Sequence, residues 1–383
     1  MIRRFGICLV AVMGLVSMRV RGDVVPVPPD PGISADAKTS LRMEPFAADI
    51  AQKISDEVNK LVQNPTDPGM VAMIRQWLIT EDPATARPPY QETYSQALNR
   101  TFMNLLSQGD PPVNTKINMG LVIKDLNAPK MNLAPTAEKL LSDKCQAVVL
   151  VGEQAGQAIL QVSVQNPNFT SEKRDKLLAA IVASVAANSD GPLAGAIAEQ
   201  AYRAINPKLW NAGAMPQGDN LSAFILANLN LQKSRIEAYR TTGVPGNPDA
   251  DTYASSLLLA KEGWNVMNSD QQFQAVQAAV YLVSYMGQRA AVSGQASNQD
   301  LIKALQDEGF WLSGMAGNIG DTVLQGVCDQ VHKLSAGMPA DTIKSTCEAV
   351  FTTAQGNPAF TELKQPQNIA GGPSSAPSSE PSP

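Results

Sequence analysis

The sequence predicts an all-α fold in which helical hairpins stack on one another. Apolar residues recur at the helical period within residues 136–205, most clearly at Leu177, Ile181 and Val185, and a second stripe follows the turn at residues 188–191. Hydrophobic residues make up 44% of the 383 residues and aromatic residues only 5%, which is typical of helices packed through small side chains. Two such helices cannot bury both faces alone, so they need neighbours on either side.

Asn-Pro pairs mark a period of about 40 residues, which is expected for HEAT or armadillo units. The pairs are Asn166-Pro167, Asn206-Pro207 and Asn247-Pro248. Residues 113–126, 140–148 and 176–205 resemble the degenerate HEAT-type helical repeats of exported bacterial proteins, although the usual Pro/Asp/Val/Arg order within each turn is missing. The resemblance covers about a quarter of the chain. It implies an irregular HEAT-like α-solenoid that serves as an interaction scaffold.

The first 22 residues are predicted to be a signal peptide. Arg3 and Arg4 form its positive start, residues 5–18 its apolar core, and cleavage is expected after Gly22. The alternative, a membrane anchor, needs roughly 18 or more apolar residues, whereas this run ends at Arg19. The protein is therefore expected to be exported, to the periplasm or the extracellular space.

Proline, glycine and serine content divides the remaining chain into further parts. These are a Pro-rich leader (23–34), a HEAT-like helical region (35–206), a linker loop (207–219), a C-terminal helical region (220–364) and a disordered Pro/Ser-rich tail (365–383).

Apolar periodicity and capping residues predict the individual helices. In the first region the predicted helices with stated bounds are residues 35–63, 90–107, 110–126 and 138–165. A further helix starts after residue 63, with Asp67 as its cap and Pro68 at its first position. The helix over residues 138–165 has Gly152 or Gly156 as its expected break point. In the second region they are residues 220–239, 251–267, 270–289, 298–308, 319–335 and 340–353. Ser269 and Gln272 are expected to form a capping box, and the glycine-rich residues 314–320 a flexible turn.

The mature chain is expected to be acidic. Removing residues 1–22 takes four arginines from the 30 basic residues and none of the 35 acidic ones, so the net charge changes from −5 to about −9. Without a basic face the chain is a poor partner for nucleic acid or for an anionic membrane surface. No later segment is long and apolar enough to span a bilayer.

Three cysteines follow the signal peptide, and an odd number in an exported protein indicates one disulfide and one remaining thiol. Cys328 and Cys347 lie on predicted helices at equal distances from the turn at residues 336–339. Residues equidistant from the turn of an antiparallel hairpin face each other, which predicts a disulfide between Cys328 and Cys347. Cys145 is then expected to be a small buried residue.

Two similar motifs combine an acidic residue, a glycine and aromatic residues. They are Glu262-Gly263-Trp264 and Glu308-Gly309-Phe310-Trp311. Two carboxylates with aromatic platforms are what a helical glycan hydrolase needs, so Glu262 and Glu308 are the candidate catalytic residues of an enzymatic interpretation. The structural interpretation is that each glycine ends or kinks a helix and each tryptophan covers a helix end.

His332 is the only histidine, so a zinc site, a serine triad or a Cys-His pair would have to use it. Cys328 precedes it by four residues on the same helix face, which makes a thiol-imidazole pair geometrically feasible. Against this, the predicted disulfide consumes Cys328, and the helix dipole by itself favours a histidine near a helix C-terminus. The sequence has no phosphate-binding loop, nucleophile elbow, calcium loop or zinc-protease motif, so neither a metal nor a cofactor is predicted.

We therefore expect an exported, non-enzymatic helical-repeat scaffold whose surface binds a protein or a cell-envelope component. The alternative is a helical hydrolase that acts on envelope glycans through Glu262 and Glu308, with Trp264 and Trp311 lining the cleft.

Overall fold

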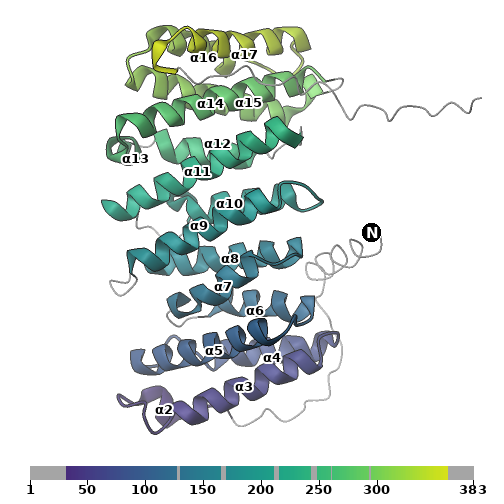
Figure 1. Cartoon of the computed structure of the whole chain (residues 1–383), viewed down its shortest axis with the longest axis vertical. Helices are drawn as coiled ribbons and strands as arrows, with labels where there is room; N and C mark the ends of the chain where they lie inside the picture. The colour runs from purple at the N-terminus through teal and green to yellow at the C-terminus, as the bar shows by residue number, and fades with distance from the viewer. Residues whose placement is uncertain are drawn as a thin grey trace, which may run out of the picture. The chain divides into compact units, whose positions relative to one another are not determined.

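The computed structural model describes residues 32–126, 130–164, 170–210, 215–242, 248–259, 261–292 and 295–360. Across these residues sixteen α-helices, α2–α17, are joined by turns and short 3-10 helices, and no strand occurs (Figure 1). The all-α prediction is confirmed. The predicted signal peptide, most of the predicted leader and the predicted tail lie outside the described residues.

The helices form two compact units. Unit 1 holds the described residues of Met1–Asn188 and Arg203–Pro216, and unit 2 holds those of Ser189–Tyr202 and Gln217–Pro383. The chain therefore passes between the units three times: after Asn188, inside α10 (Ala194–Ile205), and at Gln217, within the loop predicted over residues 207–219.

In unit 1 each of α3 to α7 packs on the helix two places further along the chain, and several of them also pack on the next helix. For example, α3 packs on α4 and α5, and α7 packs on α8 and α9. Figure 1 shows these helices following one another in chain order. They are α2 (Ala35–Thr39), α3 (Ala47–Gln63), α4 (Pro68–Thr80), α5 (Pro88–Gln108), α6 (Val113–Asp125), α7 (Ala134–Leu141), α8 (Gln146–Ser163) and α9 (Ser171–Ala187), with η1 (Lys130–Leu133) and η2 (Pro207–Leu209).

The sequence patterns of unit 1 account for most of its helices. In α3, within the helix predicted over residues 35–63, the apolar stripe of Ile50, Ile54 and Val58 is fully buried. At the start of α4, Asp67 Oδ1 accepts the amides of the first turn at 3.0 Å and Pro68 occupies the first helical position, as predicted.

Two predicted helices of unit 1 are each two helices. The break in residues 35–63 falls at residues 40–46, which include Pro45, a residue without an amide to donate. The break in residues 138–165 falls between α7 and α8, not at a glycine, because Asp143 Oδ1 accepts the Cys145 amide at 2.8 Å and forms a turn. Gly152 instead permits close packing, since a Cβ there would lie 3.0 Å from the Leu141 nitrogen.

In unit 2, α14 packs on α15 and α17, and α15 packs on α12 and α16. The helices that follow α10 are α11 (Asp219–Thr242), α12 (Pro248–Leu259), α13 (Lys261–Val266), α14 (Ser269–Ala290), α15 (Gln299–Asn318), α16 (Thr322–His332) and α17 (Ala340–Gln355), with η3 (Gln295–Ser297) and η4 (Pro358–Phe360).

Two local predictions in unit 2 are wrong. The capping box of α14 is made by Asn268 and Gln271, one residue earlier than the predicted Ser269 and Gln272. The predicted turn at residues 314–320 is largely helical, because α15 continues to Asn318 and only Gly320 has a positive φ, of 80°. Gly314 and Gly317 instead allow neighbouring residues to pack closely on α15, as Gly152 does in α8.

Candidate functional site

The motif that starts at Glu308 lies in the middle of α15, where successive side chains point about 100° apart around the axis. Glu308 is fully buried, whereas Phe310 is 51% exposed. Gly309 faces α16 so closely that a Cβ would lie 2.8 Å from the His332 nitrogen. The predicted helix end or kink at Gly309 is therefore wrong, because this glycine is a contact point between two helices.

The Glu308 carboxyl group is held by one serine. Ser255 of α12 donates its hydroxyl to Glu308 Oε1 at 2.8 Å, and Glu308 Oε2 is buried without a hydrogen-bond partner. Burial raises the pKa of Glu308 from its ordinary 4.5 to about 8, the Ser255 hydrogen bond lowers it, and the negative charges of Asp251 and Asp307 raise it. At neutral pH this side chain is therefore mostly a neutral carboxylic acid.

Polar side chains from α11 and α12 extend this buried group. Gln232 donates to the Ser255 hydroxyl at 3.3 Å, and Arg235 Nε lies 3.6 Å from Asp251 Oδ1, with both of these side chains 2% exposed. We call Gln232, Arg235, Asp251, Ser255 and Glu308 the buried polar network. Sequence reasoning missed it, although the spacing of three residues in α11 and of four in α12 places these polar residues on single helix faces.

Unit 1 contains a similar carboxyl group. Glu153 of α8 is fully buried and accepts the hydroxyl of Ser184, on α9, at 2.9 Å. Burial raises its pKa well above the usual value, against the lowering effect of the Ser184 hydrogen bond. A buried glutamic acid paired with one serine of a neighbouring helix therefore occurs among the described helices of each unit, as a packing contact.

Of the two predicted carboxylates, only Glu308 lies among the described side chains, and it is buried. Glu262 belongs to α13, and its side chain lies outside the described part of the chain, so its pairing with Glu308 stays a prediction. Trp264 is only 8% exposed, and its carbonyl oxygen accepts Gln272 Nε2 at 3.1 Å. Its indole ring is therefore part of the packing of unit 2.

An aromatic cluster does reach the surface, formed by Phe310, Trp311 and His332. The Phe310 ring meets the Trp311 ring edge to face at 5.1 Å and lies 5.4 Å from the His332 ring, centroid to centroid. His332, at the end of α16, is held by contact of its Nδ1 with the Gln306 carbonyl oxygen at 3.0 Å. The neighbouring helix thus fixes the orientation of an exposed imidazole.

His332 and Cys328 do not behave as a catalytic pair. Cys328 is fully buried, and burial, followed by the charges of Asp329, Asp321 and Glu308, raises the pKa of its thiol far above the usual value. A catalytic thiol needs a lowered pKa. His332 is exposed, and its Nδ1 contacts the Gln306 carbonyl oxygen. This carbonyl, and not the Cys328 thiol, orients the imidazole ring.

The predicted disulfide between Cys328 and Cys347 is wrong, because both are free and buried. Equal distance from a turn fixes the height of two residues along a helix pair but not their rotation about the helix axes. Cys347 is turned towards α14, where a Cβ placed on Gly287 would lie 2.3 Å from the Cys347 Cβ. Cys145 is buried, as predicted, with 9% of its surface exposed, but it is disulfide-bonded and is therefore not the remaining thiol that the sequence predicted.

Among the described residues, no group of three or more His, Cys, Asp or Glu side chains is arranged to hold a metal ion. The same residues include no helix with the length and apolar character required to cross a membrane. Comparison with known proteins finds no match, either to a protein-family model or to a curated protein.

Proposed function

We propose that this protein is an exported, non-enzymatic helical-repeat scaffold that binds a protein or a cell-envelope component through the aromatic cluster of Phe310, Trp311 and His332. The observation that carries the proposal is the 51% exposure of Phe310, a large aromatic side chain on a well-packed helix. Its ring is already oriented by two aromatic neighbours, so little side-chain entropy would be lost on binding.

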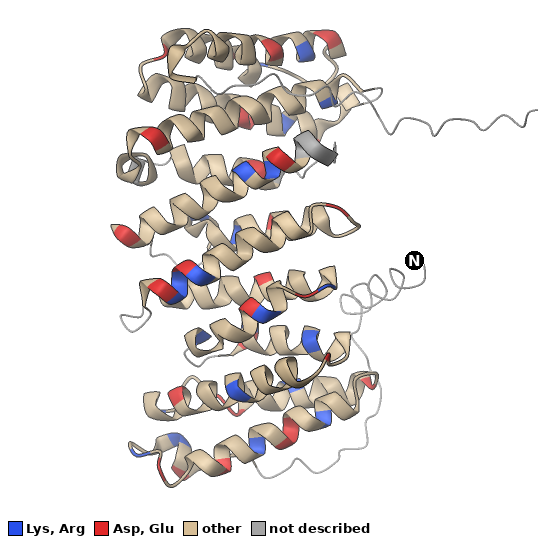
Figure 2. Ribbon diagram, in the orientation of Figure 1, with Lys and Arg blue, Asp and Glu red and all other residues tan. Residues whose placement is uncertain are grey.

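The partner contact is expected to be apolar and aromatic rather than strongly ionic. Figure 2 shows basic and acidic residues interspersed along the described helices of each unit. Such a surface lacks the concentrated positive field that phosphate groups need, which supports a protein or neutral envelope partner over nucleic acid.

The chemistry of the candidate catalytic residues supports a binding role. A general acid has to lie within hydrogen-bond reach of its substrate, whereas Glu308 is fully buried and bonded to Ser255. Its raised pKa has a structural explanation, because burial is the largest cause of the raised pKa of Glu308 and of Glu153 alike.

Partner capture tests the binding role. Wild-type protein and the Phe310→Ala variant are used as bait against solubilised envelope from the native host. Loss of one exposed aromatic anchor is expected to weaken retention of a specific partner about tenfold to a hundredfold. Val323→Ala is the matched control, because Val323 is 69% exposed on α16 but lies outside the aromatic cluster. Equal retention by both variants would contradict the assignment of the site.

Hydrolysis of envelope glycans tests the alternative function. Wild-type protein and Glu308→Gln are incubated with polymeric glycan, and released reducing ends are measured. We expect no release above buffer from either protein. Release by the wild type that disappears in Glu308→Gln would establish the enzymatic alternative instead.

A further inference from the structure

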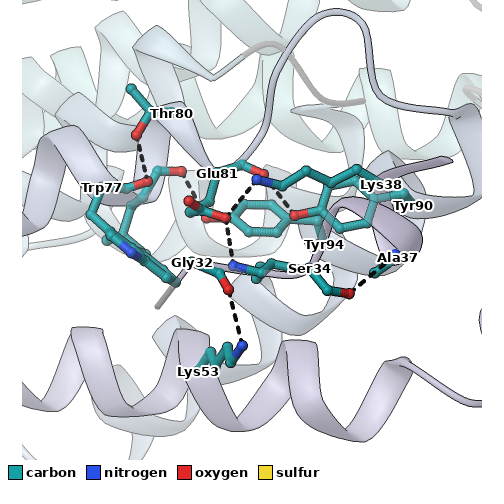
Figure 3. Close-up of polar contacts among 12 residues, drawn as sticks. Gly32, Ser34, Ala37, Lys38, Lys53, Trp77, Thr80, Glu81, Tyr90 and Tyr94 are labelled. Carbon is teal, nitrogen blue, oxygen red and sulfur yellow. Dashed lines mark hydrogen bonds and ion pairs between the residues drawn. The ribbon is translucent and has the colours of Figure 1, made fainter. Parts of the chain in front are cut away.

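The first described residues of the chain are held on unit 1 by the carboxylate of Glu81, at the C-cap of α4 (Figure 3). We call residues 32–39 the amino-terminal segment; they include α2. Glu81 Oε2 accepts the Ile33 amide at 2.8 Å and pairs with the Lys38 ammonium group at 2.8 Å. One carboxylate thus contacts both ends of the segment through charge-assisted hydrogen bonds.

Two further contacts reach main-chain atoms of the same segment. Lys53 of α3 donates its ammonium group to the Gly32 carbonyl oxygen at 3.1 Å, and the Arg87 amide donates to the Lys38 carbonyl oxygen at 2.9 Å. We call Lys53, Glu81 and the Arg87 main chain the clamp. Most of its bonds go to the backbone, so they hold the segment, with its short helix α2, in a defined direction.

Side-chain recognition is confined to a few positions of the segment. Ile33 is 4% exposed and Ala37 is 1% exposed, while the intervening residues 34–36 are exposed. At Gly32 a Cβ would lie 2.4 Å from Glu81 Oε1, so a side chain there would displace the carboxylate from its bonds. The clamp therefore accepts a glycine at position 32, an aliphatic residue at position 33 and a small residue at position 37.

The connection from the segment to the rest of unit 1 contains no fully buried residue. Among residues 40–46, between α2 and α3, Met43 and Phe46 are half-buried and Leu41 is 71% exposed. A change in the path of this connection therefore costs little packed apolar surface. An anchored element on a weakly packed connection is the arrangement that permits exchange between identical chains.

We propose that the clamp is a peptide-docking site which the chain's own residues 32–39 occupy, and that the same segment of a second copy can replace them. A second copy carries the identical segment, so it satisfies every contact described above. This inference concerns unit 1 alone and does not rest on the binding role proposed for the aromatic cluster.

Two full-length variants test the segment and the clamp one at a time. Ile33→Asp places a charge in the buried anchor position and leaves the clamp intact. Glu81→Ala removes the clamp carboxylate and leaves the segment intact. In each variant the amides of residues 33 and 38 are expected to exchange hydrogen at least about tenfold faster than in the wild type. The controls are Leu41→Asp, at the exposed connection, and Glu92→Ala, on α5, which should leave this exchange unchanged.

Mixing the two variants tests exchange directly. Fluorescently labelled Glu81→Ala chain is titrated with Ile33→Asp chain, and fluorescence anisotropy is measured. The released segment of the first variant is expected to bind the vacant clamp of the second at least about tenfold more tightly than it binds wild-type chain, whose clamp is occupied.

Three outcomes would overturn the proposal. These are unchanged amide exchange in both variants, equal binding to Ile33→Asp and wild type, and no binding although both segments are released. If the labelled variant does not fold, a labelled peptide with the sequence of residues 29–40 replaces it, and the same comparison between Ile33→Asp and wild type decides the result.

Discussion

Glu308 is the residue whose environment differs most from the role suggested by its motif. The acid, the glycine and the aromatic residues are adjacent in sequence, yet the helix sends Glu308 into the buried polar network and Phe310 to the surface. The acid is protonated because burial disfavours its charge. The native state thus binds a proton that the unfolded chain releases at a much lower pH.

Replacing Glu308 by glutamine tests this protonation. Because the pKa of Glu308 is about 8 in the folded chain and ordinarily 4.5, its contribution to stability is fully present below pH 4.5 and is lost as the pH rises to 8. The free energy of unfolding of the wild type should fall by about 3 kcal/mol between pH 5 and pH 8 from this residue alone. Glu308→Gln removes that decrease.

Urea unfolding at pH 5 and pH 8 measures the difference. Glu348→Gln, which changes an exposed pair with Lys344 on α17, is the control and should leave the pH dependence close to that of the wild type. An unchanged pH dependence in Glu308→Gln would show that the Glu308 carboxyl is already ionised in the folded chain.

The buried thiols give a second prediction at the residue scale. Burial raises the pKa of Cys347 to about 12, followed by the charge of Glu348, and it raises the pKa of Cys328 further. Native protein should therefore react with a thiol reagent at these positions only as fast as it opens. Peptide mapping after labelling in denaturant without reductant should find Cys328 and Cys347 both modified. Recovery of the two as an unmodified, disulfide-linked pair of peptides would contradict this prediction.

At the scale of elements, glycines inside helices set how closely neighbouring helices pack. Gly309 brings α15 against α16, and Gly287 brings α14 against Cys347 of α17. Both lie within helices, so their role is space rather than a turn conformation. This is why a rule that treats glycine as a helix breaker fails for this sequence.

Substitution of Gly309 by alanine tests that statement. The added methyl group would lie 2.8 Å from the His332 nitrogen and 2.9 Å from Val331 Cβ, so α15 and α16 must move apart. We expect a loss of about 1 to 3 kcal/mol in the free energy of unfolding. Gly326→Ala on α16, where no atom lies within 4 Å, should instead stabilise the chain by up to about 1 kcal/mol. Equal effects would contradict the packing role.

The sequence predicted local elements better than the contacts between them. Apolar period identified the stripe of α3, and Asp67 with Pro68 identified the start of α4, because both signals depend on neighbours in sequence. The Cys328–Cys347 disulfide and the position of Glu308 depend on rotation about helix axes and on which helix lies opposite. The spacing of residues along the chain determines neither the rotation of a helix about its axis nor the helix that packs against it.

At the scale of the whole molecule, each of α3 to α7 in unit 1 packs on the helix two places further along the chain. The HEAT-like interpretation stays a prediction. The Glu-Ser pairs of Glu153 and Glu308 occur in different units, so a buried glutamic acid held by one serine is a shared structural feature. What distinguishes unit 2 is its aromatic cluster.

Site-specific cross-linking in the native envelope tests the scaffold role most directly. A photoreactive phenylalanine analogue is placed at position 310, and in a control chain at position 323. We expect a discrete cross-linked partner from position 310 that is lost when Trp311→Ala is added, and no such product from position 323. Absence of a product at position 310, or the same products from both positions, would contradict the proposal that the aromatic cluster binds the partner.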